Sequence, residues 1–202
     1  MLRRLANWWK RRDGGVNATP DSTPAAADAA QAAAIEQARA AMRDRPALDD
    51  TIRILEVDDP AVAAHLFRRK FGQEIPQFPR HFVALAGDAC AGYVHYTAWQ
   101  GDYLCGGLCT DDRVYRTLSP VQRAWVRERG GIAEIMMRHA HAALSDGATI
   151  WGYIGDKQAE AVDRRVGFEK VAEPYLFAIW QKPISEEGKQ RRVAEAVKLG
   201  PF

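Results

Sequence analysis

The sequence has no long apolar run and few cysteines, and these absences exclude several classes of protein. No stretch of its 202 residues comes near the length of about 20 apolar residues that crosses a bilayer. The N-terminus lacks the apolar core and cleavage site of a secretory signal. Cys90, Cys105 and Cys109 are odd in number and lack Cys-x-x-Cys spacing, so neither a disulfide framework nor a zinc site is indicated. We therefore expect a cytoplasmic protein with reduced cysteines in strands and no bound metal.

Charge is nearly balanced over the whole chain. There are 28 Lys and Arg against 26 Asp and Glu, a net charge of +2, which gives no general bias toward nucleic acid. A hydrophobic content of 47% is enough to bury a normal core. We expect a basic, Ala-rich N-terminal extension and linker over residues 1–46, one folded domain over 47–184, and a C-terminal helix and tail over 185–202.

Residues 1–12 are the exception to this balance. They hold five cations, no anion and the pair Trp8-Trp9. Leu2, Leu5 and Trp9 lie near helical spacing, which is the pattern of a helix lying on a membrane surface. The same Arg and Trp residues can also meet RNA phosphates and stack on bases. Contact with an anionic membrane, contact with RNA and a simple frayed end therefore remain open alternatives.

A glycine pair, Gly130-Gly131, precedes an apolar helix expected over 131–145. Glu134 and Arg138 are expected to face outward, at i,i+4, from an apolar face made of Ile132, Ile135, Met136, His139, Ala140 and Ala143. The first amides of a helix have no internal partner and carry partial positive charge, so they can bind a diphosphate if no bulky side chain blocks it. The glycine pair removes that obstruction.

The remaining pattern predicts a mixed α/β sheet. An antiparallel meander enters the glycine loop, and a parallel βαβ unit follows it. We expect strands over 51–57, 81–86, 92–99, 103–110, 148–154, 168–173 and 175–182, and further helices after Pro60, over 157–166 and over 185–198. Helical segments at both ends extend this domain.

Residues 81–183 resemble the GNAT-type acyl-CoA N-acyltransferases. That family has the motif (Gln/Arg)-x-x-Gly-x-(Gly/Ala), and Gly131-x-Ala133 fits its second half, while Glu128 holds the Gln/Arg position. The family also often shows Asn-x-x-Ala-x-x-x-Tyr-x-x-x-Gly-Phe. Ala159, Gly167 and Phe168 keep that pattern, whereas Asp156 and Asp163 replace its Asn and Tyr.

The resemblance implies a fold, a co-substrate and contact residues. The co-substrate is acetyl-CoA or another acyl-CoA, whose thioester is attacked directly by a primary amine of a small molecule or protein. In the family the fourth strand splays from the fifth and its backbone binds pantetheine and the thioester carbonyl, which points to Leu108, Cys109 and Thr110. The glycine loop supplies the other predicted cofactor contacts, namely Arg129, Gly130, Gly131, Ile132, Ala133 and Glu134. The segment 111–129 is longer than is typical of the family, and its arginines are candidates for extra phosphate contacts.

Amine acylation needs a base for the amine proton and an acid for the thiolate. Among the titratable groups near the expected cleft, His95 and Asp111 rank first as the base, and the pKa of a histidine suits proton transfer near neutrality. The family's Tyr often protonates the thiolate, but Asp163 stands in its place here. Tyr153 and, as a second choice, Tyr175 are the candidates for that role.

Three functions follow as alternatives. The first is an acyl-CoA-dependent N-acyltransferase. The second is a catalytically inactive protein of the same fold that binds acyl-CoA as a sensor or scaffold, since Glu128 and Asp163 replace expected residues. The third makes residues 1–45 the functional part, tethering the domain to membrane or RNA. A homodimer is among the assemblies that the sequence allows.

Overall fold

The computed structural model describes residue 36 and residues 48–172 and 174–202. The described residues from 48 onward belong to one compact unit, Asp44–Phe202. The predictions made for residues 1–46, including the basic segment and the Ala-rich helix, lie outside the described residues, apart from the single residue Glu36. Within the described ranges, no helix has the length and apolar character needed to span a membrane.

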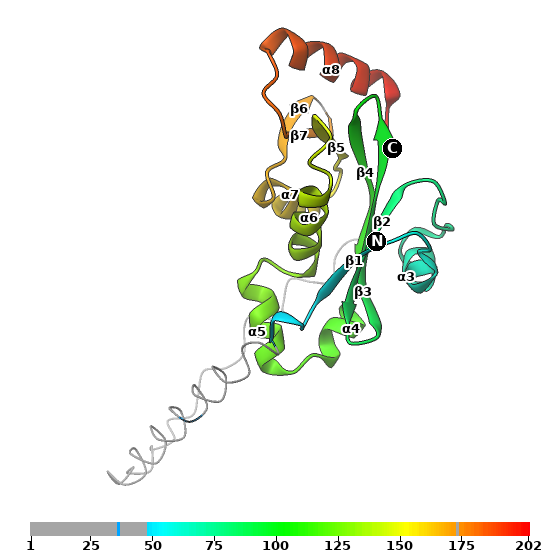
Figure 1. Ribbon diagram of the computed structural model, residues 1–202, viewed down its shortest axis with the longest axis vertical. Helices are drawn as coiled ribbons and strands as arrows, with labels where there is room; N and C mark the ends of the chain where they lie inside the picture. The colour runs from blue at the N-terminus through cyan, green and yellow to red at the C-terminus, as the bar shows by residue number, and fades with distance from the viewer. Residues whose placement is uncertain (1–35, 37–47, 173) are drawn as a thin grey trace, which may run out of the picture. The chain divides into compact units, whose positions relative to one another are not determined.

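The core of this unit is a seven-stranded sheet with the order β1-β2-β3-β4-β5-β7-β6 (Figure 1). All neighbouring strands are antiparallel except β4 and β5, which are parallel. The strands are β1 (Arg53–Val57), β2 (Arg80–Ala86), β3 (Ala89–Trp99), β4 (Asp102–Thr110), β5 (Thr149–Tyr153), β6 (Glu169–Ala172) and β7 (Leu176–Trp180). The predicted fold, an antiparallel meander joined to a parallel βαβ unit, is confirmed.

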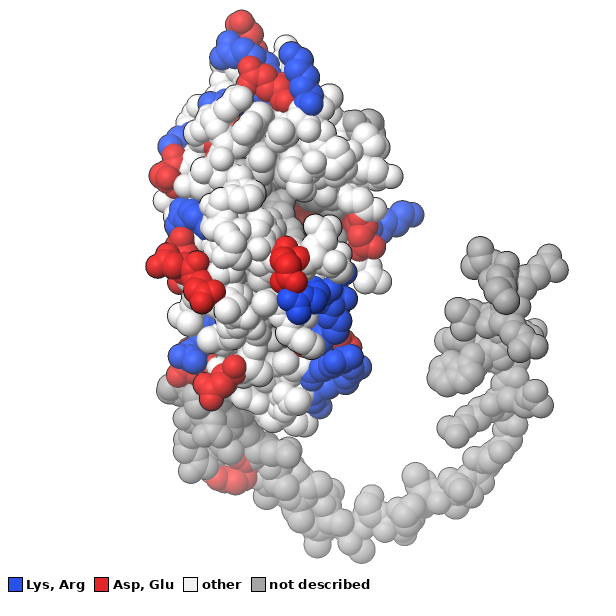
Figure 2. Space-filling view, turned by 90° about the vertical axis from the view of Figure 1, so that its right-hand side faces the viewer, with Lys and Arg blue, Asp and Glu red and all other residues white. Residues whose placement is uncertain are grey.

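Helices cover both faces of the sheet (Figure 1). They are α3 (Ala61–Phe71), α4 (Asp112–Thr117), α5 (Pro120–Glu128), α6 (Ile132–Ala143), α7 (Lys157–Arg165) and α8 (Glu186–Leu199). Alternate residues of a strand face opposite sides. On β3, Tyr93 packs in a cluster with α3, whereas Val94 and Tyr96 pack in the main core with α6. The α3 side, which faces the viewer in Figure 2, carries few charged side chains in its middle.

The long segment between β4 and the glycine loop forms two helices that the sequence analysis did not predict. Asp111 caps α4 by accepting from the amide of Arg113. Ser119 and Gln122 form a capping box around the start of α5, with Pro120 in its first turn. Ser-Pro-x-Gln was a readable signal for a helix start.

The buried face of α6 differs from the predicted one. Met137 is fully buried, while His139 and Ala143 are exposed, so the apolar stripe is turned relative to our expectation. Glu134 was predicted to face outward, yet only 7% of its surface is exposed. The reason is electrostatic, because two arginines pair with its carboxylate where it lies against the glycine loop.

The C-terminal helix α8 is anchored to the start of β4 by a buried charge. Asp102 is 2% exposed and accepts from the Arg192 guanidinium at 2.6 Å and from Trp151 Nε1 at 3.0 Å. Trp151 lies on β5, so the contact joins α8 to both strands of the parallel pair. Residues from these elements form a separate apolar cluster that includes Leu104, Trp151 and Ala196.

Candidate functional site

The parallel strands β4 and β5 are paired along only part of their length. Their register joins Tyr103 to Ile150, Leu104 to Trp151 and Cys105 to Gly152. Beyond Cys105, β4 continues to Thr110, whereas β5 ends one residue after Gly152. The backbone of β4 from Gly106 onward therefore has no described partner on its β5 side. This is the parting of strands that the resemblance implies.

At this opening β4 carries a β-bulge. Tyr93 of β3 lies opposite Cys109 and His95 lies opposite Gly106, so two residues of β4 face the single residue between them on β3. Gly107 has a φ of 60°, which favours glycine. Of the three predicted contact residues, Leu108 lies in the bulge, Thr110 pairs with Gly92, and Cys109 is buried in the α3 cluster. Burial raises the pKa of the Cys109 thiol to about 12, so it is not a thiolate near neutral pH.

The His95 imidazole lies over this bulge on the α3 side of the sheet. A Cβ atom at Gly106 would come within 2.6 Å of His95 Nε2, and one at Gly107 would come equally close to His95 Cε1. The two glycines therefore let the ring approach the β4 backbone. Burial, followed by the neighbouring His81, lowers the pKa of His95 to about 4. The ring is neutral at pH 7 and retains one nitrogen that can accept a proton.

The other two predicted catalytic residues have different surroundings. Asp111 is held as the cap of α4 and by an ion pair with Arg69 at 2.8 Å. Tyr153 lies at the end of β5, with its ring 5.8 Å from that of Tyr175 and 6.1 Å from that of Phe202. The structure brings His95 to the β4 bulge, whereas Asp111 already has two structural partners.

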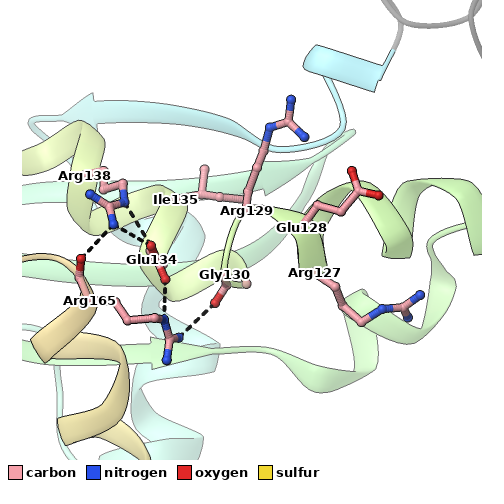
Figure 3. A pocket seen from close by; sticks show the side chains of 9 residues that line it. Arg127, Glu128, Arg129, Gly130, Glu134, Ile135, Arg138 and Arg165 are labelled. Atoms are coloured by element: carbon pink, nitrogen blue, oxygen red, sulfur yellow. Dashed lines mark hydrogen bonds and ion pairs between the residues drawn. The ribbon is translucent and has the colours of Figure 1, made fainter.

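The glycine loop borders a hollow of about 990 Å³ (Figure 3). Gly130 and Gly131 have φ values of 81° and 99°, and both amides are engaged, by the carbonyls of Arg127 and Val126. The amides left without an intrahelical acceptor are those of the first turn of α6, Ile132, Ala133 and Glu134. We predicted unpaired amides around residues 130–135; in the structure the amides of Gly130, Gly131 and Ile135 donate to backbone carbonyls, which leaves those of residues 132–134.

The Glu134 carboxylate occupies the space beside Gly130. A Cβ atom at Gly130 would lie 1.9 Å from Glu134 Oε2, so a side chain there would collide with it. Arg138 donates to Oε1 at 2.6 Å and Arg165 donates to Oε2 at 2.7 Å. Arg165 also donates to the Gly130 carbonyl, and Arg138 to the Arg165 carbonyl (Figure 3). These contacts form a closed cluster that we call the Glu134 clamp.

The arginines around the hollow play unequal parts. Arg129, predicted as a cofactor contact, stacks on the Trp125 ring at 4.0 Å and points away from Glu134 (Figure 3). Segment 111–129 is described throughout, and two of its arginines, Arg127 and Arg129, line the hollow. Arg138 and Arg165 were not among the residues predicted for the site. The Glu134–Arg138 spacing was visible in sequence, whereas nothing local links Arg165 to this loop.

Asp163, on α7, is a buried acid beside the start of the opening. It is 4% exposed, and burial, followed by the nearby Glu160, raises the pKa of its carboxyl to about 7. Cys105, the last β4 residue paired with β5, has a thiol whose pKa is raised to about 12 by burial and then by Asp163. The electrostatic influence of Asp163 on the Cys105 thiol indicates that its carboxyl lies near the residue at which pairing between β4 and β5 ends.

No family model matches the chain, and no relative is found among curated proteins. Similar solved structures include the ribosomal-protein-S18-alanine N-acetyltransferase from Escherichia coli, at 13% identity, covering 67% of this chain and 97% of that one, with a TM-score of 0.49. The aminoglycoside 6'-N-acetyltransferase from Enterococcus faecium matches at 10% identity, 66% and 99% coverage, and a TM-score of 0.47.

A GNAT family acetyltransferase from Brucella melitensis in complex with acetyl-CoA matches at 16% identity, 68% and 92% coverage, and a TM-score of 0.45. The fold class itself is given by the strand order and the parallel β4–β5 pair of this chain. The chain is thus similar to acetyltransferases of known structure, some of them of the GNAT family, at identities of 10–16%.

Proposed function

We propose that this protein is an acyl-CoA-dependent N-acyltransferase that transfers an acyl group, most simply acetyl, to a primary amine. The observation that carries the proposal is the opening between β4 and β5, with the neutral His95 ring against the β4 bulge. A thioester in this opening would meet free β4 backbone groups and a proton acceptor in one place. The sequence resemblance gives the co-substrate its chemical class.

In this proposal the amine nitrogen attacks the thioester carbon while His95 Nε2 accepts the amine proton. Backbone amides of β4 within Leu108–Thr110 donate to the oxyanion of the tetrahedral intermediate. The carbon–sulfur bond then breaks and the thiolate takes a proton from Asp163. The diphosphate of the co-substrate lies at the first turn of α6, where the amides of residues 132–134 and the guanidinium groups of Arg138 and Arg165 favour an anion.

Two measurements on the full chain test this proposal. Calorimetric titration with acetyl-CoA should show binding, and thiol release in the presence of a panel of primary amines should show turnover. Polyamines, amino sugars and peptide N-termini cover the main chemical classes of acceptor. Binding without turnover on the whole panel would favour the second function below, and the absence of both would refute the acyl-CoA assignment.

One observation favours a second function, an acyl-CoA binder or sensor without catalysis. The Glu134 carboxylate lies at the helix start where a diphosphate is expected, and it already satisfies both arginines. An incoming diphosphate must therefore separate the arginines from Glu134 or share them with it. Such competition gives weak, salt-sensitive binding, which suits a protein that responds to co-substrate concentration.

The Glu134 clamp leads to a prediction about affinity. Glu134→Gln removes a negative charge from beside the diphosphate and frees Arg138 and Arg165, so we expect CoA to bind about tenfold more tightly, or about 1.4 kcal/mol. Calorimetry at low and high salt measures the change. Glu128→Gln is the matched control, because Glu128 lines the same hollow but is exposed, and its effect should be about twofold at most. Weaker binding by Glu134→Gln would instead mean that Glu134 positions the arginines for the ligand.

Asp163 leads to a prediction about pH. An acid must be protonated to act, and a pKa raised to about 7 means that the protonated fraction falls as the pH rises through about 7. We expect kcat to fall over that range in the wild type. In Asp163→Asn, kcat should no longer fall as the pH rises through this range, and at slightly acidic pH it should be about a hundredfold lower than in the wild type. Tyr153→Phe should keep the wild-type profile, and if it removes the alkaline fall instead, Tyr153 is the acid.

The N-terminal tether remains a separate prediction about residues outside the described ranges. Deleting residues 1–20 and measuring retention on anionic liposomes and on RNA tests it. Loss of retention with unchanged acyl-CoA binding would assign a tethering role to that segment, and unchanged retention would reject it.

A further inference from the structure

Three aromatic side chains form a row of contacts that ends at the β4 bulge. His81 Nδ1 lies 2.8 Å from the Tyr93 hydroxyl, and the same hydroxyl lies 3.3 Å from His95 Nδ1. The rings of His81 and Tyr93 are stacked, with their centroids 6.0 Å apart. His81 comes from β2, and the other two from one face of β3. We call these three residues the His81–His95 row.

The far end of this row is a buried nitrogen without a full partner. His81 is 2% exposed and Tyr93 is fully buried, and no described group meets His81 Nε2 with full hydrogen-bond geometry, although the Gln77 backbone carbonyl acts on the ring as an acceptor. Buried polar atoms are normally hydrogen-bonded, so a ring nitrogen with an incomplete hydrogen bond in a packed core is unusual. The row therefore ends at a buried ring whose Nδ1 contacts the Tyr93 hydroxyl and whose Nε2 is left with little stabilisation from the protein.

A relay along this row requires one particular pair of tautomers at rest. A hydroxyl can donate one hydrogen bond and accept others. If Tyr93 donates to His81 Nδ1, at the shorter distance, His95 Nδ1–H donates to the Tyr93 oxygen. His95 Nε2 then keeps its lone pair and faces Gly106, and His81 carries its proton on Nε2.

We propose that Tyr93 and His81 relay the amine proton away from His95, so that the positive charge of the reaction ends on His81 rather than beside the thioester. This inference rests on the proposed acyltransferase function. His95 Nε2 takes the proton from the attacking amine, His95 Nδ1–H passes to the Tyr93 oxygen, and the Tyr93 hydroxyl proton passes to His81 Nδ1. His95 and Tyr93 end neutral, and His81 gains one proton and one positive charge.

The surroundings of the two histidines explain why the relay is useful. With its pKa lowered to about 4, His95 alone would be charged in about one molecule in a thousand at pH 7, which makes it a weak base. Burial lowers the pKa of His81 below its ordinary value as well, and the Asp59 carboxylate and then the Gln77 carbonyl offset part of this lowering. Two further groups beside the row, the Phe67 ring from α3 and the Cys109 thiol from β4, are uncharged at pH 7.

Tyr93→Phe tests the relay because it removes one oxygen atom and leaves the ring. Tyr93 and His81 act through His95 and are positioning residues, so a pH profile is the first readout. In the wild type, we expect the apparent pKa of the acidic limb of kcat/KM to reflect protonation of the three linked residues together. In Tyr93→Phe the limb should move down toward pH about 4, with kcat lowered about tenfold to a hundredfold and KM for acyl-CoA unchanged. Tyr96→Phe is the matched control, since Tyr96 is buried on the same strand but faces the α6 side, and its acidic limb should stay in place.

Nitrogen NMR of labelled histidines provides a readout that does not depend on turnover. In the wild type we expect neutral His95 with its proton on Nδ1 and neutral His81 with its proton on Nε2. Tyr93→Phe should change the tautomer balance of His95, whereas Tyr96→Phe should leave it as in the wild type. Thermal unfolding establishes that both variants are folded.

The outcomes separate this inference from the proposed function. An active wild type whose pH profile and histidine signals are unchanged in Tyr93→Phe overturns the relay and leaves the acyltransferase assignment intact. A wild type that turns over no amine refutes the assignment, and with it the relay, even if the NMR spectra show the expected hydrogen bonds.

Discussion

Replacing His95 with glutamine is expected to lower kcat for amine acylation about a hundredfold to a thousandfold, with little change in KM for acyl-CoA. Glutamine keeps a polar side chain of similar reach but has no nitrogen that can take up a proton. The loss should exceed that of Tyr93→Phe, because His95 meets the amine directly while Tyr93 only carries the proton onward. Steady-state rates with the best amine of the panel measure it.

Asp111→Asn is the comparison for this variant, since Asp111 is the other predicted base. Its carboxylate caps α4 and pairs with Arg69, so we expect a loss of about 1–2 kcal/mol in the free energy of unfolding and a kcat per folded molecule close to that of the wild type. If Asp111→Asn abolishes turnover while His95→Gln retains it, Asp111 is the base and His95 is not.

Much of the fold was predictable because its signals are local. The strand patterns over 81–86 and 92–99, with Gly87-Asp88 after the first, indicated the β2–β3 hairpin, and the strand pattern over 148–154 indicated β5. Gly130-Gly131 marked the start of α6, and the structure confirms a helix from Ile132. In each case the residues that determine the structure lie within a few positions of one another.

The candidate site was less predictable because its parts meet across long distances in sequence. Arg165 reaches Glu134 over 31 positions, and no spacing rule connects them. The surroundings of His95 depend on His81 from a neighbouring strand and on the glycines of the β4 bulge. The sequence could select His95 by its chemistry, but it could not show that Glu134 turns inward or that Asp163 is buried beside Cys105.

Replacing Arg192 with methionine is expected to lower the free energy of unfolding by about 3 kcal/mol and the melting temperature by roughly 6–12 °C. The reason is that the Asp102 carboxylate would lose its counter-ion. Asp102 is 2% exposed, and without Arg192 its carboxylate keeps one described hydrogen bond, from Trp151. A buried charge without its counter-ion costs more than the pair contributes when both partners are present.

Arg191→Met is the matched control, because Arg191 is the exposed neighbour on the same helix and its replacement should change the free energy of unfolding by less than about 0.5 kcal/mol. Adding Asp102→Asn to Arg192→Met should recover part of the loss, since it removes the stranded charge. Equal melting temperatures for Arg191→Met and Arg192→Met would contradict the anchoring role of this ion pair.

The same contact connects stability to the opening in the sheet. Asp102 begins β4 and Trp151 lies in β5, so Arg192 holds α8 against the only part of the described structure where β4 and β5 pair with each other. Loosening α8 should free the paired segment before the antiparallel meander unfolds. Hydrogen exchange in Arg192→Met is therefore expected to speed up first at the amides of Tyr103–Cys105 and Ile150–Gly152, and to remain slow in β2 and β3.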